Sequence, residues 1–246
     1  MMMKVIIAKT EAEMNNAGAD LIEQLLKEKP DACLGLATGS SPVGMYQELI
    51  RRCEAGQVDF SKACSVNLDE YVGLTGEHPQ SYRYFMNEQL FNHVNIDKAR
   101  TTVACGVGDP EENLAAFRGE IAAKPRDIQV LGVGVDGHIA FNEPGEVLHG
   151  LAHMETLDES TIEANQRFFA SRDDVPRKAF TMGMAEIMHA RKLLLLVNGA
   201  SKAKAISQLL LTDEITTANP VTMVRLHPDV TVVMGQELAD AIGYKA

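Results

Sequence analysis

The sequence has little basic charge, few cysteines and no long apolar run. Its 246 residues contain 23 Lys and Arg against 34 Asp and Glu, which gives a formal net charge of −11. A surface that binds nucleic acid needs a basic face to displace counterions, so this composition argues against a nucleic-acid partner. It does not exclude a small anionic ligand, because a pocket sets its own local field.

Membrane and secreted classes are also disfavoured. The longest apolar stretch, Leu193–Val197 (LLLLV), is far shorter than the ~20 residues that span a bilayer. The opening residues MMMKVIIAKTEAEM lack a sustained apolar region and soon turn acidic, so we expect a first strand there and no signal peptide. The sequence has four cysteines without CxxC spacing, which predicts reduced thiols: Cys33, Cys53, Cys64 and Cys105. We therefore expect a soluble cytoplasmic protein with no membrane partner.

Short apolar, β-branched runs alternate with segments of helical period along the chain. Several of these runs are apolar on both faces, which is typical of parallel strands buried between helices. This pattern predicts an α/β fold, a three-layer α/β/α sandwich with a mostly parallel sheet, in one domain of residues 1–246. The expected strands are Lys4–Ala8, Ala32–Ala37, Cys64–Leu68, Thr101–Cys105, Ile128–Gly134, Lys192–Val197, Val221–Leu226 and Val230–Met234. The expected helices are Glu11–Glu28, Val43–Ala55, Ser81–Asn92, Glu111–Ala123, Thr161–Phe169, Met184–Arg191 and Ser201–Leu211.

Residues 145–178 interrupt this alternation. The segment is polar, mixed in charge and poor in strand formers, and it contains one short expected helix, Thr161–Phe169. We predict an excursion from the sheet that would serve as a lid; a plain surface excursion is the alternative.

The first unusual strand end is Thr38-Gly39-Ser40-Ser41-Pro42, which precedes a helix. Ligands of open α/β sheets bind beyond the carboxyl ends of the strands. A Gly/Ser/Thr turn entering a helix offers backbone N–H groups, hydroxyls and the positive end of the helix dipole, which suit a phosphate. There is no GK[ST] sequence, so nucleoside triphosphate chemistry is not implied. The alternative is an ordinary helix start with Ser40 or Ser41 as the cap.

The second strand end carries two adjacent acids, Asp69 and Glu70. Neighbouring side chains point in different directions, so we expect only one of them to face a given cleft. A strand-end carboxylate in a partly dry pocket can act as a general base, especially if burial raises its pKa. A helix cap or turn acid is the alternative.

The third strand end places Asp136, His138 and Glu143 within eight positions. Histidine is the side chain whose ordinary pKa lies near neutrality, and a flanking carboxylate could orient it and bias its protonation. No Ser or Cys nucleophile stands in an elbow, so acyl-enzyme chemistry has little support. The spacing matches neither HExxH nor an EF-hand, so we predict no metal site.

A set of motifs points to one family. In chain order these are ATGSSP, VNLDEYVGL, SYRYFMNEQLF, LGVGVDGHIAFNEPG, ANQRFF, TMGM, NGASKA and LHPDVTVV. Together they closely resemble the glucosamine-6-phosphate deaminases (glucosamine-6-phosphate isomerases), from about Lys4 to Met234. DGHIAFNEPG is the strongest element; the related 6-phosphogluconolactonases share DGH but typically continue toward an SLFP-like sequence. The resemblance implies a phosphosugar isomerase-type α/β sandwich, conversion of glucosamine 6-phosphate and water to fructose 6-phosphate and ammonia, and no catalytic cofactor.

The resemblance also assigns roles by position. Asp69 matches the base that moves a proton between C2 and C1, and His138 matches the acid/base that opens the pyranose ring. Asp136 and Glu143 match the carboxylates that flank and tune that histidine. The phosphate site carries over as Thr38, Gly39, Ser40, Ser41, Arg167 and Lys202. Since Arg167 lies within residues 145–178, the expected lid would close on the phosphate.

The sequence departs from the allosteric, hexameric members of this family. Those members carry basic residues shortly after FNEPG and a longer C-terminal segment, which bind N-acetylglucosamine 6-phosphate. Here His153 and Glu155 stand where an arginine and a lysine are expected, and the sequence ends at Ala246. We therefore expect a constitutively active enzyme of the short type, a monomer or small homo-oligomer. The alternatives are a 6-phosphogluconolactonase-like hydrolase and a non-catalytic sugar-phosphate sensor, which would lack the acid/base set or add a DNA-binding module.

Overall fold

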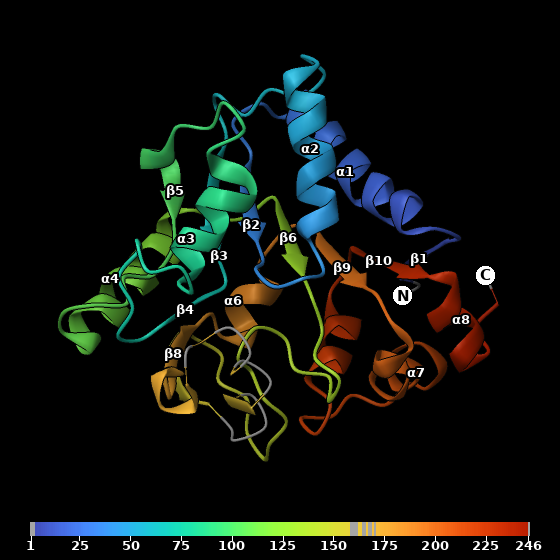
Figure 1. Ribbon diagram of the computed structural model, residues 1–246. Coiled ribbons are helices and arrows are strands. Elements are labelled where there is room, and N and C mark those ends of the chain that lie inside the picture. The colour runs from blue at the N-terminus through green and yellow to red at the C-terminus, as the bar shows by residue number, and fades with distance from the viewer. Residues whose placement is uncertain (1–2, 158–161, 164–165, 167–168, 170, 246) are drawn as a thin grey trace.

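A seven-stranded sheet in which all neighbouring strands run parallel forms the centre of the molecule (Figure 1). The computed structural model describes residues 3–157, 162–163, 166, 169 and 171–245. Across the sheet the order is β1 (Lys4–Ala8), β10 (Val230–Gly235), β9 (Leu193–Val197), β6 (Ile128–Leu131), β2 (Cys33–Leu36), β3 (Cys64–Asn67) and β5 (Thr101–Thr102). Every residue of β2, β6 and β9 is buried, as the two-sided apolar runs predicted.

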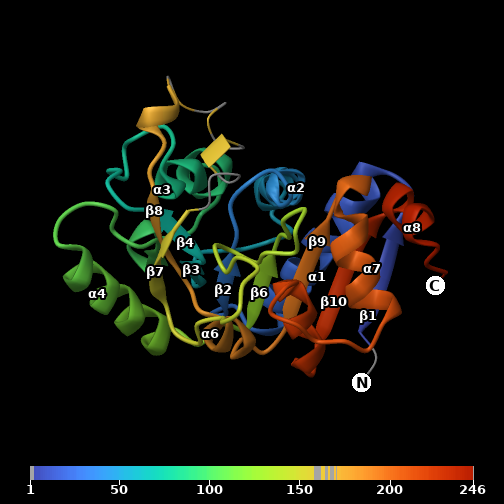
Figure 2. The same cartoon turned by 90° about the horizontal axis from the view of Figure 1, so that it is seen from below.

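Helices cover both faces of this sheet, which confirms the predicted α/β fold. Helices α1 (Glu11–Glu28) and α2 (Val43–Glu54) lie together on one face, and α6 (Met184–Met188), α7 (Ala203–Leu211) and α8 (Gln236–Ile242) lie on the other (Figures 1 and 2). Helix α4 spans Pro110–Ala123, and α3 (Tyr82–Met86) continues into a π-helical turn, Asn87–Phe91. No helix in the described part of the chain is both long and apolar enough to cross a bilayer.

Helices α1 and α2 approach closely where α1 has a glycine. A Cβ atom on Gly18 would lie 2.8 Å from the Sδ atom of Met45 in α2 and 3.4 Å from Leu196 in the sheet. Gly18 and Met45 are both buried. The absence of a side chain at this position therefore lets the helix pair sit directly on β9.

A second, antiparallel sheet lies beside the first and carries part of the candidate site. Its order is β4 (Asp69–Tyr71), β8 (Lys178–Thr181) and β7 (His153–Thr156). The described part of residues 145–178 lies outside the large sheet, as predicted, and it contains the strand β7, which was not predicted. The helix expected at Thr161–Phe169 lies largely outside the described residues.

The strand predicted at Val221–Leu226 is wrong: residues Pro220–Leu226 form the 3₁₀ helix η5. Only three residues separate this segment from β10, too few for the crossover that two parallel strands require. Both edges of β10 are already occupied, by β1 and by β9, so no antiparallel pairing is open either. The β-branched residues of the segment are buried by packing on its neighbours instead: Val221, Thr222 and Val224.

The direction of strand addition reverses between β2 and β6. From β2 the chain adds β3 and β5 toward one edge, and it then returns to place β6 and β9 on the other side of β2. Loops that leave two adjacent strands at such a reversal diverge to opposite faces and open a crevice at their carboxyl ends. The structure therefore places a ligand site beyond β2 and β6.

Candidate active site

A cavity of about 700 Å³ opens at the carboxyl ends of β2, β3, β6 and β9. It gathers the turn at Thr38–Ser41 with Asp69, Asp136, His138 and Lys202, although these residues are distant in sequence. The other residues that line it are Glu11, Met14, Ala37, Leu68, Tyr82, Gly132, Val133, Gly134, Val135, Ala140, Phe141, Asn198 and Gly199. Arg167, which the family resemblance assigned to the phosphate site, lies outside the described residues.

The Thr38–Ser41 turn is held by a tyrosine of the following helix. The buried Tyr46 hydroxyl donates to Ala37 O at 2.7 Å and accepts from Ala37 N at 3.2 Å, which fixes the end of β2 against α2. Gly39 has φ +83°, a conformation that favours glycine.

The start of α2 is suited to an anion. Its N-cap residue is Pro42, and within the described structure no side-chain hydrogen bond caps the helix, so the alternative in which Ser40 or Ser41 is the cap is wrong. The first turn also contains no acidic residue. Unsatisfied N–H groups at a helix start attract a negatively charged group, and this one begins at the cavity.

Lys202 brings a cation to the same cavity from the end of β9. A turn at Gly199, with φ +89°, leads into the short 3₁₀ helix η4 (Ala200–Lys202), and Lys202 N donates to Gly199 O at 3.2 Å. Burial lowers the pKa of Lys202, and the nearby carboxylate of Asp136 opposes that shift. A partly desolvated ammonium beside an open helix start gives an anion two independent anchors.

Asp69 stands at the junction of the two sheets and is 7% exposed. The preceding residue, Leu68, accepts a hydrogen bond at 2.7 Å from the backbone N–H of Met182, the residue that follows β8. This bond connects the junction to the small sheet. Within the described residues Asp69 Oδ1 is buried without a hydrogen-bond partner. Burial raises the pKa of Asp69 to about 8, with a further contribution from the charge of Glu70 and an opposing one from His138. This carboxyl group is therefore poised to exchange a proton near neutral pH.

Glu70, the neighbour of Asp69, does not line the cavity. Its carboxylate accepts hydrogen bonds from Tyr71 N at 2.8 Å and from Tyr82 N and Arg83 N at 2.9 Å each. It thereby joins β4 to the first turn of α3. The adjacent acids thus have separate environments, one at the cavity and one at a helix start.

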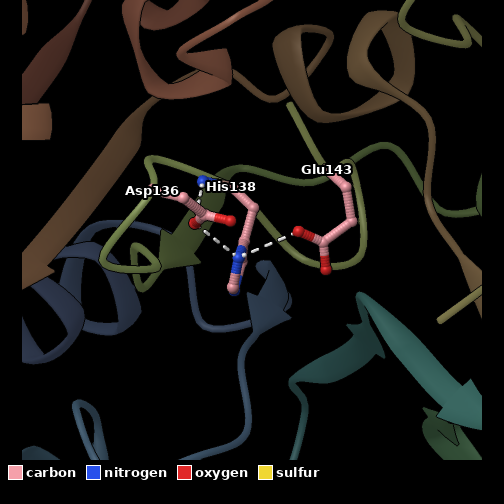
Figure 3. A group of neighbouring side chains, drawn as sticks. All are labelled: Asp136, His138 and Glu143. Atoms are coloured by element: carbon pink, nitrogen blue, oxygen red, sulfur yellow. Dashed lines mark hydrogen bonds and ion pairs between the residues drawn. The ribbon is translucent and has the colours of Figure 1, made fainter. Parts of the chain in front are cut away.

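His138 lies between two carboxylates (Figure 3). Its Nδ1 atom is 2.8 Å from Asp136 Oδ1 and 3.3 Å from Glu143 Oε2. Burial disfavours the charged imidazolium, but the two carboxylates outweigh that effect and raise the pKa of His138 to about 9. The same pairing holds the pKa of Asp136 well below its ordinary value. Because both carboxylates lie at Nδ1, Nε2 is the ring nitrogen left for a ligand.

The same three side chains could be considered for a cation, since they offer one donor atom each within 4.8 Å of one another. In this geometry, however, the Nδ1 atom of His138 is already paired with the carboxylates. That arrangement orients an acid/base histidine, whereas a metal would need the same nitrogen lone pair.

The loop that carries His138 is anchored to the small sheet. Phe141 N donates to Thr181 Oγ1 at 3.1 Å, and the buried Asn142 Nδ2 donates to Ile139 O at 3.0 Å and to Met182 O at 2.9 Å. These contacts fix the part of the loop between His138 and Glu143.

Aromatic side chains form one wall of the cavity, a feature that was not predicted from the sequence. The rings of Tyr82 and Phe141 stack at 6.2 Å between centroids, and Tyr71 packs on Tyr82 at 4.9 Å. Burial keeps the pKa of the Tyr82 phenol well above its ordinary value. The helix start at Ser81, whose hydroxyl accepts from Tyr84 N at 3.0 Å, is the one local signal that places Tyr82 on a first helical turn.

Comparison with known proteins shows the family to which this chain belongs. The family model described as glucosamine-6-phosphate isomerases/6-phosphogluconolactonase matches residues 8–233. The chain is 50% identical over 242 residues to a glucosamine-6-phosphate deaminase of Clostridium beijerinckii, covering 98% of this chain and 100% of the relative. It is 47% identical to the glucosamine-6-phosphate deaminase of Thermoanaerobacter pseudethanolicus, covering 98% of this chain and 95% of the relative.

A solved structure agrees with these sequence relatives. It is a monomeric glucosamine-6-phosphate deaminase, 40% identical, with a TM-score of 0.92 over 97% of this chain and 100% of the other. This chain therefore belongs to the family of glucosamine-6-phosphate isomerases and 6-phosphogluconolactonases.

Proposed function

We propose that this protein is a glucosamine-6-phosphate deaminase that converts glucosamine 6-phosphate and water to fructose 6-phosphate and ammonia. The observation that carries the proposal is the presence in one cavity of a buried carboxyl group, Asp69, and a carboxylate-paired histidine, His138. An aldose–ketose shift needs a group that carries a proton between two carbons, and ring opening needs a separate donor and acceptor. The names of relatives at 47% and 50% identity favour the deaminase over the lactonase.

The phosphate would be the main anchor of the substrate, because its binding fixes the position of the reacting carbons. Thr38, Gly39, Ser40 and Ser41 offer the turn and the helix start described above, and Lys202 offers the counter-charge. Arg167 is retained in this proposal on the resemblance of ANQRFF alone. Binding energy from this unreactive end becomes useful when it orients the sugar for reaction.

His138 would open the pyranose ring. With a pKa of about 9 it is protonated at neutral pH and can donate from Nε2 to the ring oxygen as the C1–O5 bond breaks. The neutral imidazole then accepts the proton of the anomeric hydroxyl, which leaves the aldehyde at C1 and restores the imidazolium. Asp136 and Glu143 hold the imidazole at Nδ1, which sets both its orientation and its charge.

Asp69 would then act on the open chain. In its ionised form the carboxylate removes the proton from C2 and returns it to C1, while a proton passes from the amino group to O1. The product has a hydroxyl at C1 and an imine at C2. Water adds to that imine, and ammonia leaves with the formation of the ketone of fructose 6-phosphate. Within the described structure, Asp69 Oδ1 is buried and has no hydrogen-bond partner. A bound substrate would supply that partner.

The direct test is release of ammonia from glucosamine 6-phosphate by the purified protein. Equimolar fructose 6-phosphate and ammonia are expected, and hydrolysis of 6-phosphogluconolactone should be at background. Lactone hydrolysis without ammonia release would reverse the assignment in favour of the family's other activity. Tight sugar-phosphate binding with neither reaction would instead favour a sensor.

We further propose that residues 1–246 act as one catalytic unit and that the enzyme works as a monomer without an allosteric activator. Strands from both halves of the chain meet at the cavity, and a monomeric deaminase is the solved relative described above. His153 and Glu155, which replace the expected basic pair, contact each other in β7, with Nε2 of His153 at 3.1 Å from Glu155 Oε2. The negative charge of Glu155 disfavours binding of an anionic activator beside β7.

A further inference from the structure

The loop from Asp136 to Gly145 is held at both ends by one distant segment. We name residues 216–221 the clamp segment. Gly145 N donates to Thr217 O at 3.2 Å, and Val221 N donates to Gly137 O at 2.9 Å. The acid/base loop therefore rests on residues that follow it by more than seventy positions in the chain.

The side chain of Asn219 forms a third contact with this loop. A Cβ atom on Gly137 would lie 1.7 Å from Asn219 Oδ1, so the amide oxygen occupies the space directly over the glycine. Gly137 also has φ +93°, which other residues rarely adopt. Glycine is thus required there for two reasons, its backbone conformation and the approach of Asn219.

The other end of the same amide is bound to α7. Asn219 Nδ2 donates to Ala205 O at 3.1 Å and to Gln208 Oε1 at 2.9 Å. Helix α7 begins at Ala203, directly after Lys202. One buried side chain, 5% exposed, therefore contacts both the loop that presents His138 and the helix that follows Lys202.

The clamp segment does not need this side chain to keep its own shape. Its turn is closed by Thr222, whose hydroxyl accepts from Thr216 N at 2.9 Å and lies within hydrogen-bond distance of Asn219 O at 2.7 Å. Asn219 N donates to Thr216 O at 3.3 Å through the backbone. The Asn219 amide thus makes contacts outside the segment, as a bridge between two other elements.

We propose that Asn219 is a positioning residue that sets the spacing between the acid/base histidine and the phosphate-binding lysine. The inference rests on the proposed function, in which His138 acts at the ring while Lys202 holds the phosphate at the other end of the same sugar. A substrate anchored at one end reacts only when the group at the other end is correctly placed, and an error of about 1 Å can cost on the order of a hundredfold in rate. The bridge fixes that distance without touching the substrate.

The test compares Asn219→Ala with Asn95→Ala. Asn95 is the control because its side-chain amide also joins separate segments but lies on the surface and away from the cavity. Its Oδ1 accepts from Phe60 N at 2.8 Å and from Cys53 Sγ at 3.5 Å, and its Nδ2 donates to Asp59 Oδ1 at 2.7 Å. For Asn219→Ala we expect kcat per folded molecule to fall about tenfold to a hundredfold. KM for glucosamine 6-phosphate should change by less than about threefold, because the phosphate contacts remain. Asn95→Ala should keep kcat within about twofold.

A second measurement does not depend on turnover. Amide hydrogen exchange of residues 136–145 should accelerate in Asn219→Ala and stay unchanged in Asn95→Ala, because the first loses the loop contact and the second does not. Equal kcat losses in the two variants, or wild-type exchange of the loop in Asn219→Ala, would overturn the proposal. If the wild-type protein releases no ammonia, the proposed function fails, while the exchange result still decides whether Asn219 holds the loop.

Discussion

Asp69 and Glu70 are adjacent in β4, yet one carboxyl group lines the cavity and the other accepts three backbone N–H groups. The Glu70 carboxylate is held in place, because moving it would leave the N–H groups of Tyr82 and Arg83 at the start of α3 without their acceptor. Its negative charge therefore stays close to Asp69, where it adds to the effect of burial and raises the pKa of the proposed base. This relationship leads to a prediction about the pH dependence of the enzyme.

Glu70→Gln should move the acidic limb of the kcat/KM profile to lower pH. The proposed base works in its ionised form, so activity of the free enzyme should rise with pH through about 8. Removing the charge of Glu70 favours ionisation of Asp69, and a shift of up to about one pH unit is expected. Glu88→Gln, an exposed substitution in the turn that continues α3, serves as the control and should leave the limb in place. A limb that does not move in Glu70→Gln would remove Glu70 from this role.

Asp69→Asn should abolish most turnover and also raise thermal stability at pH 8. Below its ordinary pKa of 3.8 the carboxyl group is protonated in both folded and unfolded chains, and it makes no difference to stability. Between that pH and about 8 the unfolded chain ionises while the folded protein does not, so the wild type loses stability relative to the amide. Melting curves should show a gain of at least several degrees at pH 8 that fades toward pH 4. An equal gain at both pH values would contradict the buried acid.

Asp136→Asn should lower the pH at which activity is lost on the alkaline side. His138 is proposed to donate a proton, so kcat/KM should fall as pH rises through about 9. Loss of the neighbouring carboxylate lowers the pKa of the imidazole, and the alkaline limb should shift toward neutral pH. NMR titration of the His138 ring gives an independent reading of the same pKa. A raised imidazole pKa in the variant would contradict the pairing seen at Nδ1.

Lys202→Met should weaken substrate binding more than it slows the chemical step. A charge-assisted contact to the phosphate is worth about 1.5–3 kcal/mol, so KM should rise by about tenfold or more. Lys204→Met, an exposed change two residues further along, provides the comparison and should leave KM near the wild-type value. If both variants raised KM equally, a general loss of positive charge would explain the result better than a phosphate site.

Velocity should depend hyperbolically on glucosamine 6-phosphate and should not respond to N-acetylglucosamine 6-phosphate. The reason is the His153–Glu155 contact, which places a carboxylate where a basic pair would attract the activator's phosphate. Initial rates with and without the activator, together with light scattering at the assay concentration, test the kinetic and the oligomeric expectation together. Sigmoidal rates that the activator makes hyperbolic would refute both.

The central sheet could be predicted because its strands carry their signal locally. Seven of the eight expected strands are present. The signal is clearest for a central strand such as β9, because a parallel strand buried on both faces is a continuous apolar run. The strand ends were also informative, because the sheet brings the residues after β2, β3 and β6 to one edge whatever the loops do. Lys202, which follows β9, was expected at the site on the family resemblance alone. The sequence thus indicated which polar residues would meet before their geometry was known.

The small antiparallel sheet could not be predicted in the same way. Its strands have three or four residues, too few to show an alternating pattern, and β7 has no fully buried residue. The aromatic wall at Tyr82 and the bridge at Asn219 depend on contacts between elements far apart in sequence. In both cases the residue type is compatible with an ordinary helix or turn, and only the tertiary structure shows which groups it contacts.

The reversal between β2 and β6 also bears on how the enzyme folds. Leu34 pairs with Ile128 and Gly35 with Gln129, so the two strands that flank the cavity come together only by closing a loop of nearly a hundred residues. Pairings this distant in sequence form late and slowly compared with hairpins and helices. A nascent chain that has not yet reached β6 contains the phosphate turn and Asp69 but no opposite wall. Catalytic competence should therefore appear abruptly, with the last cooperative step of folding, and not accumulate as individual helices form.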